Sequence, residues 1–355
     1  MNTILASDYS IVFNENAYSK LNKLLAQNNY SKIFILVDEN TNEYCLPEFL
    51  PLLATEIAFE IIEIESGELQ KNIQTCTDIW TVLTELGADR KSVILNLGGG
   101  VLTDLGGFVA ATFKRGIDFI NIPTTLLGMV DAAIGGKNGV DLGVLKNQVG
   151  TITNPQLVLI DTRFLNSLPQ NQMRSGLAEM LKHGLIFDQN YWNLFQDLAQ
   201  LDLSDLDLLI HRAIEIKNQI VLQDPKEQNL RKSLNFGHTL GHAIESYFLE
   251  NEEKTSLLHG EAIAIGMILE SYLSLQEKLI DMETYHQIKN TIKSIFGTVE
   301  IFENDLDPIC DLLVHDKKNE YGKVQFVLLA GIGQVKMNQE VAISLIMSAF
   351  KDYKS

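Results

Sequence analysis

The sequence predicts an α/β fold: an N-terminal, doubly wound, mostly parallel, Rossmann-like sheet domain followed by an all-helical C-terminal domain. Three observations predict it. The first half alternates short apolar runs with helical patterns, which is typical of parallel βαβ units. After Leu168-Pro169 the strand runs largely vanish and long helical stretches follow. The length of 355 residues suits two domains with separate cores. We therefore divide the chain into residues 1–168 and 169–355.

The elements of the first half are predicted from Ile- and Val-rich runs bounded by polar residues or glycine. Buried strands are expected at 32–37, 57–64, 92–97, 119–122 and 157–160. Helical spacing between them predicts helices at 72–86 and 101–111. In the second half, helices are expected at 171–185, 206–222, 238–248, 261–275 and 281–296, and the apolar run 324–329 indicates a late hairpin strand.

Composition and charge limit the partners of the chain. Hydrophobic residues make up 46% and charged residues 21%, as in an ordinary globular protein. The net charge of −18, without a run of Lys or Arg, argues against nucleic acid or an anionic membrane as a partner. No stretch reaches the roughly 20 apolar residues of a membrane helix, and we expect no signal peptide from MNTILASDYS. Cys45, Cys76 and Cys310 are an odd, widely spaced set, so we expect free thiols and a cytoplasmic location.

Two glycine-rich segments of the first half are candidate anion sites. The strand at 92–97 runs directly into Gly98-Gly99-Gly100 and a helix, where backbone N–H groups and the helix dipole favour a pyrophosphate. The motif is not GxGxxG, and an ordinary strand-to-helix turn is an equal alternative. In the second segment, 134–146, Lys137 and Lys146 lie among glycines and favour phosphate or carboxylate contacts over a solvated face.

Carboxylates near these segments are the remaining candidates of the first half. Asp38 ends an early strand, where it can bind ribose hydroxyls or serve as a turn or N-cap residue. Asp131 lies just after Pro123-Thr124-Thr125 and before the second glycine segment.

Three segments of the second half carry metal-type residues. Helical spacing places Glu179, Lys182 and His183 on one face, and His238 with His242 on another. If the second helix extends backward, Asn235 and Arg231 continue that stripe, and LLHGE supplies His259 before a further helix. A carboxylate and imidazoles on facing helices resemble a catalytic zinc site with an open position.

Spacing alone leaves the ligand set open. Single helical histidines are usually structural, and Glu179 could be a surface carboxylate paired with Lys182. The residues do not decide which histidines bind metal; the candidates are His183, His238, His242 and His259.

Longer motifs resemble the 3-dehydroquinate synthase family, in the same order from about residue 37 to 335. They are GGGVLTDLGGFVAATFKRGI, IPTTLLGMVDAAIGGKNGVD, LKNQVGT, SGLAEMLKHGLI, LNFGHTLGHAIE, LHGEAIAIGM and DKKN. The resemblance implies an NAD- and zinc- (or cobalt-) dependent lyase of the shikimate pathway, which leads to chorismate and the aromatic amino acids. Such an enzyme converts 3-deoxy-D-arabino-heptulosonate 7-phosphate to 3-dehydroquinate and phosphate, and is a cytoplasmic homodimer. Residues 1–168 would then bind NAD, and residues 169–355 would bind metal and substrate.

The resemblance also assigns roles to individual residues. The metal ligands fall on Glu179, His238 and His259, while His242 matches an active-site histidine that is not a ligand. The cofactor contacts fall on Asp38, Glu68, Lys71, Gly99, Gly100, Val101, Asp104, Thr124, Thr125, Lys137, Lys146 and Ser167. The substrate contacts fall on Asp131, Lys137, Asn147, Lys182, Lys217, Arg231, Asn235 and Lys317.

Three details of this correspondence stand apart. Arg115 in FKRG resembles the arginine that reaches the phosphate site of a neighbouring subunit. Ser167 in NSLP replaces the usual threonine and keeps its hydroxyl. His183 has no family role, and we expect it to be structural.

Three alternatives compete with this function. The nearest is another sugar-phosphate cyclase with a different phosphorylated substrate. The second is a metal-dependent polyol dehydrogenase, which would release NADH and would lack the many bases directed at phosphate. The third is a non-enzymatic, dinucleotide-binding regulator, against which the set of Glu179 and three histidines argues.

Overall fold

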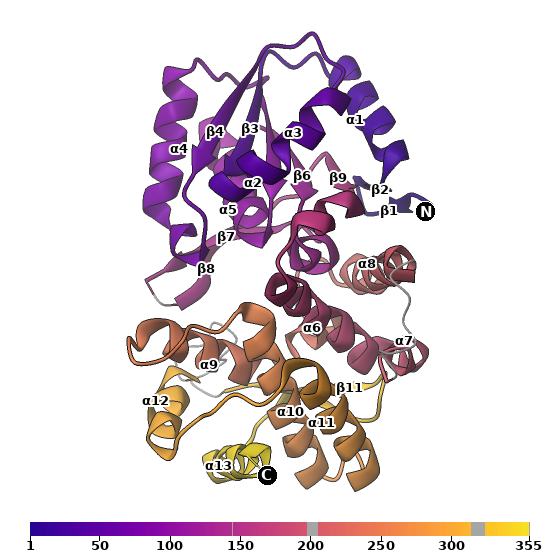
Figure 1. The fold of residues 1–355 in the computed structure, drawn as a ribbon, viewed down its shortest axis with the longest axis vertical. Helices are drawn as coiled ribbons and strands as arrows, with labels where there is room; N and C mark the ends of the chain where they lie inside the picture. Colours follow the sequence, from indigo (N-terminus) through magenta and orange to yellow (C-terminus); the bar gives the residue numbers. More distant parts are fainter. Residues whose placement is uncertain (144, 197–204, 314–323, 355) are drawn as a thin grey trace. The chain divides into compact units, whose positions relative to one another are not determined.

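The computed structural model describes residues 1–143, 145–196, 205–313 and 324–354 (Figure 1). The chain forms two compact units, Met1–Met173 and Arg174–Ser355, and each is described by itself. The functional division expected at 168/169 stays a prediction.

Unit 1 is built on a seven-stranded sheet in the order β1-β2-β9-β6-β5-β3-β4. Its strands are β1 (Ile4–Leu5), β2 (Ser10–Phe13), β3 (Ile33–Asp38), β4 (Phe59–Ile64), β5 (Val93–Gly98), β6 (Asp118–Pro123) and β9 (Leu157–Ile160). The pair β1–β2 is antiparallel, and the other neighbours pair in parallel. The predicted mostly parallel sheet is confirmed, and the five predicted strands all occur.

Helices cover this sheet as the βαβ rhythm predicts. They are α1 (Glu15–Gln27), α2 (Glu39–Tyr44), α3 (Leu46–Phe49), α4 (Ile73–Glu85) and α5 (Gly100–Thr112). Helix α5 packs on β3, β5 and β6. Its buried Leu102 and Leu105 join a core that also contains Leu36 of β3 and Leu83 of α4.

The second glycine segment, 134–146, lies mostly in a two-stranded ribbon. It forms an antiparallel ribbon of β7 (Lys137–Leu142) and β8 (Leu145–Ile152), which lies outside the main sheet. Strand β7 packs on α5. The ribbon therefore gives Lys137 and Lys146 fixed backbone positions, because each is part of a hydrogen-bonded ladder.

Unit 2 is helical, as predicted, with one hairpin among its described residues. Its helices are α6 (Gln170–Phe187, which begins in unit 1), α7 (Gln189–Asn193), α8 (Leu206–Gln223), α9 (His238–Glu250), α10 (His259–Gln276), α11 (Met282–Phe296), α12 (Glu303–Leu313) and α13 (Ile343–Lys354). The antiparallel hairpin of β10 (Phe326–Leu329) and β11 (Val335–Gln339) contains the predicted strand. Helix α10 is buried on nearly every side and packs on α9, α11, α13 and β10, so it is the centre of the unit.

Among the residues that the structure describes, none of the helices has the length and apolar character that crossing a bilayer requires.

Candidate functional site

Three histidines of unit 2 converge because two helices begin at the same place. His238 is the first residue of α9, His259 is the first residue of α10, and His242 lies one turn along α9. One ring nitrogen from each of the three lies within 4.8 Å of those of the other two. Glu179 of α6 completes the group, with Oε1 at 3.5 Å from Nε2 of His238 and 3.7 Å from Nε2 of His259. The four residues singled out on three separate segments therefore form one cluster.

The outer ring nitrogens of two histidines have polar partners. Nδ1 of His238 lies 3.1 Å from the carbonyl oxygen of Phe236, and Nδ1 of His259 lies 3.1 Å from Oε2 of Glu245. Since an acceptor at Nδ1 favours the tautomer that carries its proton there, Nε2 is left as the electron-pair donor. Both Nε2 atoms face Glu179, which is the donor arrangement of a zinc-type site.

The carboxylate of Glu179 is fully buried and also contacts the ammonium group of Lys182. In this environment the pKa of His259 is raised to about 10: burial lowers it, but the nearby carboxylates of Glu245 and Glu179 outweigh burial. The cluster therefore attracts a cation strongly, whether a proton or a metal ion.

Three predicted bases of unit 2 are buried, although the chain carries a net charge of −18. Lys182 on α6, Lys217 on α8 and Arg231 on the turn before α9 are each 5% exposed or less. Together they supply local positive charge, which a chain that is acidic overall requires to bind an anionic ligand. The amide of Asn235 donates to Oε1 of Glu227 at 2.9 Å.

The loop that positions Arg231 depends on Asp224, a residue that was not predicted from the sequence. Its carboxylate accepts the backbone N–H groups of Gln228, Asn229 and Arg231 at 3.0, 2.6 and 3.0 Å. Burial raises the pKa of Asp224, but these hydrogen bonds outweigh burial and hold it below its usual value. The Asp-Pro pair that ends α8 was the available signal, since it is typical of a turn.

In unit 1, the predicted glycine turn is positioned as an anion site requires. Gly99 is the N-cap of α5 and provides no side-chain cap, so the first amides of the helix are open to a ligand. The N–H of Thr124 donates to the carbonyl of Gly98 at 3.1 Å, and a Cβ at Gly99 would lie 3.0 Å from Cγ2 of Thr125. The predicted turn and the Thr124-Thr125 pair are therefore neighbours.

Four predicted cofactor residues form charged pairs near the ribbon. Nζ of Lys71 lies 2.6 Å from Oδ2 of Asp104, and Nζ of Lys146 lies 2.8 Å from Oε1 of Glu68. Asp141, which was not predicted, lies 3.6 Å from Nζ of Lys146. Burial lowers the pKa of Lys71, but Asp104 and the other carboxylates outweigh it and raise the pKa overall. Burial raises the pKa of Asp104.

Two further cofactor candidates have structural roles of their own. Asp38 is the N-cap of α2 and accepts the N–H of Thr41 at 2.8 Å. This confirms the N-cap role that was predicted as one alternative for Asp38. The hydroxyl of Ser167 donates to the carbonyl of Phe164 at 3.1 Å. Contacts of either residue with a cofactor stay predictions.

The other predicted residues are placed by less regular backbone. Asp131 lies in the π-helical turn Gly128–Ala132, a feature that is frequent at functional sites. Asn147 has φ 51° and donates its N–H to Asp141 at 2.6 Å. Arg115 is exposed and has φ 72°. Lys317 lies outside the described residues.

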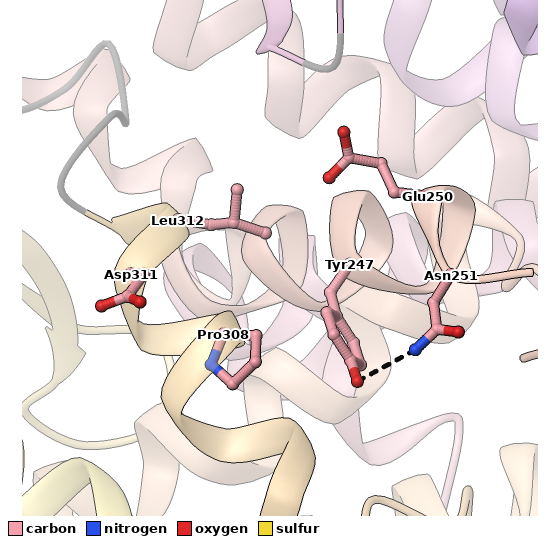
Figure 2. A pocket seen from close by; sticks show the side chains of 6 residues that line it. All are labelled: Tyr247, Glu250, Asn251, Pro308, Asp311 and Leu312. Atoms are coloured by element: carbon pink, nitrogen blue, oxygen red, sulfur yellow. Dashed lines mark hydrogen bonds between the residues drawn. The ribbon is translucent and has the colours of Figure 1, made fainter. Parts of the chain in front are cut away.

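A separate hollow of about 460 Å³ lies at the end of α9 (Figure 2). It is lined by Tyr247, Glu250, Asn251, Pro308, Asp311 and Leu312, none of which belongs to the histidine cluster.

Comparisons with known proteins find relatives that match nearly the whole chain. Family models described as 3-dehydroquinate synthase N-terminal and C-terminal match residues 61–175 and 176–319. A 3-dehydroquinate synthase of Parabacteroides distasonis is 42% identical over 350 residues, which cover 98% of each chain. One of Helicobacter pylori is 36% identical and covers 91% of this chain and 92% of its own.

Solved structures share the fold. A 2-deoxy-scyllo-inosose synthase complexed with carbaglucose-6-phosphate, NAD⁺ and Co²⁺ is 25% identical with a TM-score of 0.85, covering 99% of this chain and 100% of that one. An NADH-dependent butanol dehydrogenase of Thermotoga maritima is 14% identical with a TM-score of 0.63 over 99% of this chain and 98% of its own, so it shows a shared fold alone.

Proposed function

The chain belongs to the 3-dehydroquinate synthase family, and we propose that it converts 3-deoxy-D-arabino-heptulosonate 7-phosphate to 3-dehydroquinate and inorganic phosphate. It is a carbon–oxygen lyase that uses NAD and a divalent metal ion. The observation that carries the substrate assignment is the set of buried bases Lys182, Lys217 and Arg231 in the same unit as the histidine cluster. A substrate that bears both a carboxylate and a phosphate suits a site with several bases, because Arg and Lys form charge-assisted hydrogen bonds with both groups.

The cluster fits a divalent metal. Glu179, His238 and His259 would hold the ion, because both Nδ1 atoms have polar partners and both Nε2 atoms face the carboxylate. In unit 1, the open amides of α5 would hold the pyrophosphate of NAD, and Glu68, Lys71 and Asp104 would contact the rest of the cofactor. When bound, the metal would supply polarisation of a substrate alcohol, and the dinucleotide would supply reversible hydride transfer.

The chain's own residues would then orient the substrate and move protons. Arg231 offers a planar donor pair that suits a carboxylate, and Asp224 fixes the loop that carries it. Lys182 and Lys217 compensate substrate charge. His242 lies beside the two metal histidines and is placed to exchange a proton with the substrate during phosphate elimination. Ring opening and intramolecular aldol closure would complete the proposed conversion.

The remaining predicted contacts belong to the same proposal. Asp131, Lys137, Asn147, Asn235 and Lys317 contact the substrate, and Arg115 completes the phosphate site of a second subunit. We therefore propose a cytoplasmic homodimer that binds a phosphorylated sugar acid and neither nucleic acid nor membrane.

A related sugar-phosphate cyclase is the nearest alternative, and the choice of substrate tests it. The purified protein is incubated with zinc, catalytic NAD⁺ and either the heptulosonate phosphate or glucose 6-phosphate. Mass spectrometry should find 3-dehydroquinate from the first sugar and no cyclised product from the second. The opposite preference would overturn the substrate assignment while leaving the family intact.

A further inference from the structure

We propose that two buried carboxylates, Glu245 and Glu270, are positioning residues that cross-brace the histidine-bearing helices and set the metal affinity of the site. Each helix provides a carboxylate to the histidine turn of the other helix. The inference rests on the proposed function, because it concerns the residues behind the metal ligands.

Glu245 belongs to α9 but acts on a residue of α10. It follows His238 by seven residues, so the two lie on the same face of α9. Its Oε2 accepts from Nδ1 of His259 at 3.1 Å, and its side chain is 8% exposed, against 25% for His259. The carboxylate is thus the more deeply buried partner, and it fixes both the tautomer and the rotation of the ring. Nε2 of His259 is thereby directed at Glu179.

Glu270 belongs to α10 but acts on the start of α9. Its side chain is fully buried, and it accepts the N–H groups of Gly237 and Leu240 at 2.6 and 3.2 Å. The N-cap of α9 is Gly237, which has no side chain to cap the helix. The Glu270 carboxylate from the neighbouring helix therefore replaces an N-cap side chain, and it lies at the positive end of the α9 dipole. His238 lies between the two amides that Glu270 binds.

Glycine allows α9 and α10 to approach closely enough for each carboxylate to reach the other helix. A Cβ at Gly266 of α10 would lie 1.9 Å from the carbonyl oxygen of Gly237, and Gly237 itself has φ 78°. Any larger residue at position 266 would push the helices apart. The braces and the glycine contact are consequently parts of one arrangement.

The two braces predict a specific effect on the metal. Burying a carboxylate usually lowers the free energy of unfolding, so two buried carboxylates suggest a role beyond stability. Mutation of a residue that hydrogen-bonds to a metal ligand typically changes the metal affinity by about 10- to 100-fold. Loss of Glu245 frees the His259 ring, whereas loss of Glu270 loosens the turn that presents His238. Both should weaken metal binding although neither residue is a ligand.

The test measures metal binding in the full-length protein without substrate. Zinc affinity is obtained by competition with a chromophoric chelator, and the ligand field from the visible spectrum of bound Co²⁺. Glu245→Gln and Glu270→Gln are compared with Glu250→Gln and Glu277→Gln, which remove the same charge at exposed ends of the same helices. The brace variants should bind zinc about 10- to 100-fold more weakly and shift the cobalt bands, and the controls should stay within about twofold of the unsubstituted protein.

Two results would contradict the inference and are distinguishable. If the unsubstituted protein binds one zinc and both brace variants match the controls in affinity and spectrum, the brace is refuted and the proposed function stands. If the unsubstituted protein binds no metal, the proposed function and the brace both fail. The melting temperature of each variant is measured to show that it is folded. If Glu270→Gln does not fold, the zinc affinity and cobalt spectrum of Glu245→Gln alone decide the inference.

Discussion

At the scale of single residues, three of the predicted site residues, His238, Arg231 and Asn235, are held by polar contacts within the protein. The ring of His238 is bound to a carbonyl, the guanidinium of Arg231 donates to the carbonyl of Pro225 at 2.8 Å, and the amide of Asn235 donates to Glu227. Such contacts reduce the number of orientations that the side chain must give up when a ligand binds. These three side chains are therefore held in place in the protein without a ligand.

Arg231→Ala should strongly reduce turnover, since it leaves substrate charge poorly compensated. We expect a loss in kcat/KM equivalent to about 2–5 kcal/mol, with the dissociation constant for NAD nearly unchanged. The matched control is Lys226→Ala, which removes an exposed base from the same loop and should have little effect. Equal losses in the two variants would show that Arg231 makes no direct contact with substrate.

Asp224→Asn should destabilise the protein in a pH-dependent manner. The folded pKa of Asp224 is lowered, so its contribution is present above the unfolded pKa of about 3.9 and is lost as the pH falls through the folded pKa. Urea unfolding at pH 7 should show a loss of roughly 1–3 kcal/mol that shrinks below about pH 4. Asp307→Asn, at an exposed position, is the control. A loss that is the same at pH 3 and pH 7 would refute this account.

At the scale of elements, the sequence predicts what depends on local pattern. The Ile- and Val-rich runs located β3, β5, β6 and β9, and the helical periodicity located α6, α8, α9, α10 and α11. Strand β2 was missed because its short run SIVF acquires its place only by pairing with β9, nearly 150 residues later. The ribbon β7–β8 was missed because its glycines and polar residues lack the alternation that identifies a strand.

The site shows the same limit. Motif resemblance supplied Glu179, His238 and His259, but Glu245 and Glu270 bind groups on another helix or at its start, far away in the sequence. Carboxylates of this kind have no local signature, since any helical Glu has the same appearance in the sequence. Only tertiary contact distinguishes them.

Gly266→Ala tests the contact between α9 and α10. The added Cβ meets backbone oxygen at 1.9 Å, so the helices must separate, at a cost of about 1–3 kcal/mol in unfolding free energy. Gly241→Ala is the comparison: its nearest neighbour, at 2.8 Å, is the end of the flexible Ile263 side chain, and the loss should be smaller. Urea midpoints measure both variants. A larger loss at position 241 would contradict the assigned close approach.

At the scale of the whole molecule, the chain divides its chemistry between two units. Unit 1 contains the open helix N-terminus and the charged pairs that suit a dinucleotide, and unit 2 contains the metal-type cluster and buried bases. A dehydrogenase requires the first set and a metal, but it has no need of several buried bases for a carboxylate and a phosphate. The combination favours a cyclase that oxidises its substrate, eliminates phosphate and then reduces the intermediate again.

The proposed dimer predicts complementation between subunits. Lys114, Arg115 and Gly116 have φ values of 48°, 72° and 108°, a backbone that is costly for the two non-glycine residues and is typical of functional loops. Mixing Arg115→Ala chains with His242→Ala chains, each inactive alone, should restore part of the activity in heterodimers. Heterodimers without activity would show that Arg115 acts within its own chain or not at all.

A cyclase and a dehydrogenase are distinguished by following phosphate and NADH in the same reaction. The protein is supplied with zinc, the heptulosonate phosphate and NAD⁺ at a small fraction of the substrate concentration. The proposed function predicts that inorganic phosphate is released over many turnovers per NAD⁺, with no net rise in NADH absorbance. Stoichiometric NADH without phosphate would contradict it and would identify a polyol dehydrogenase instead.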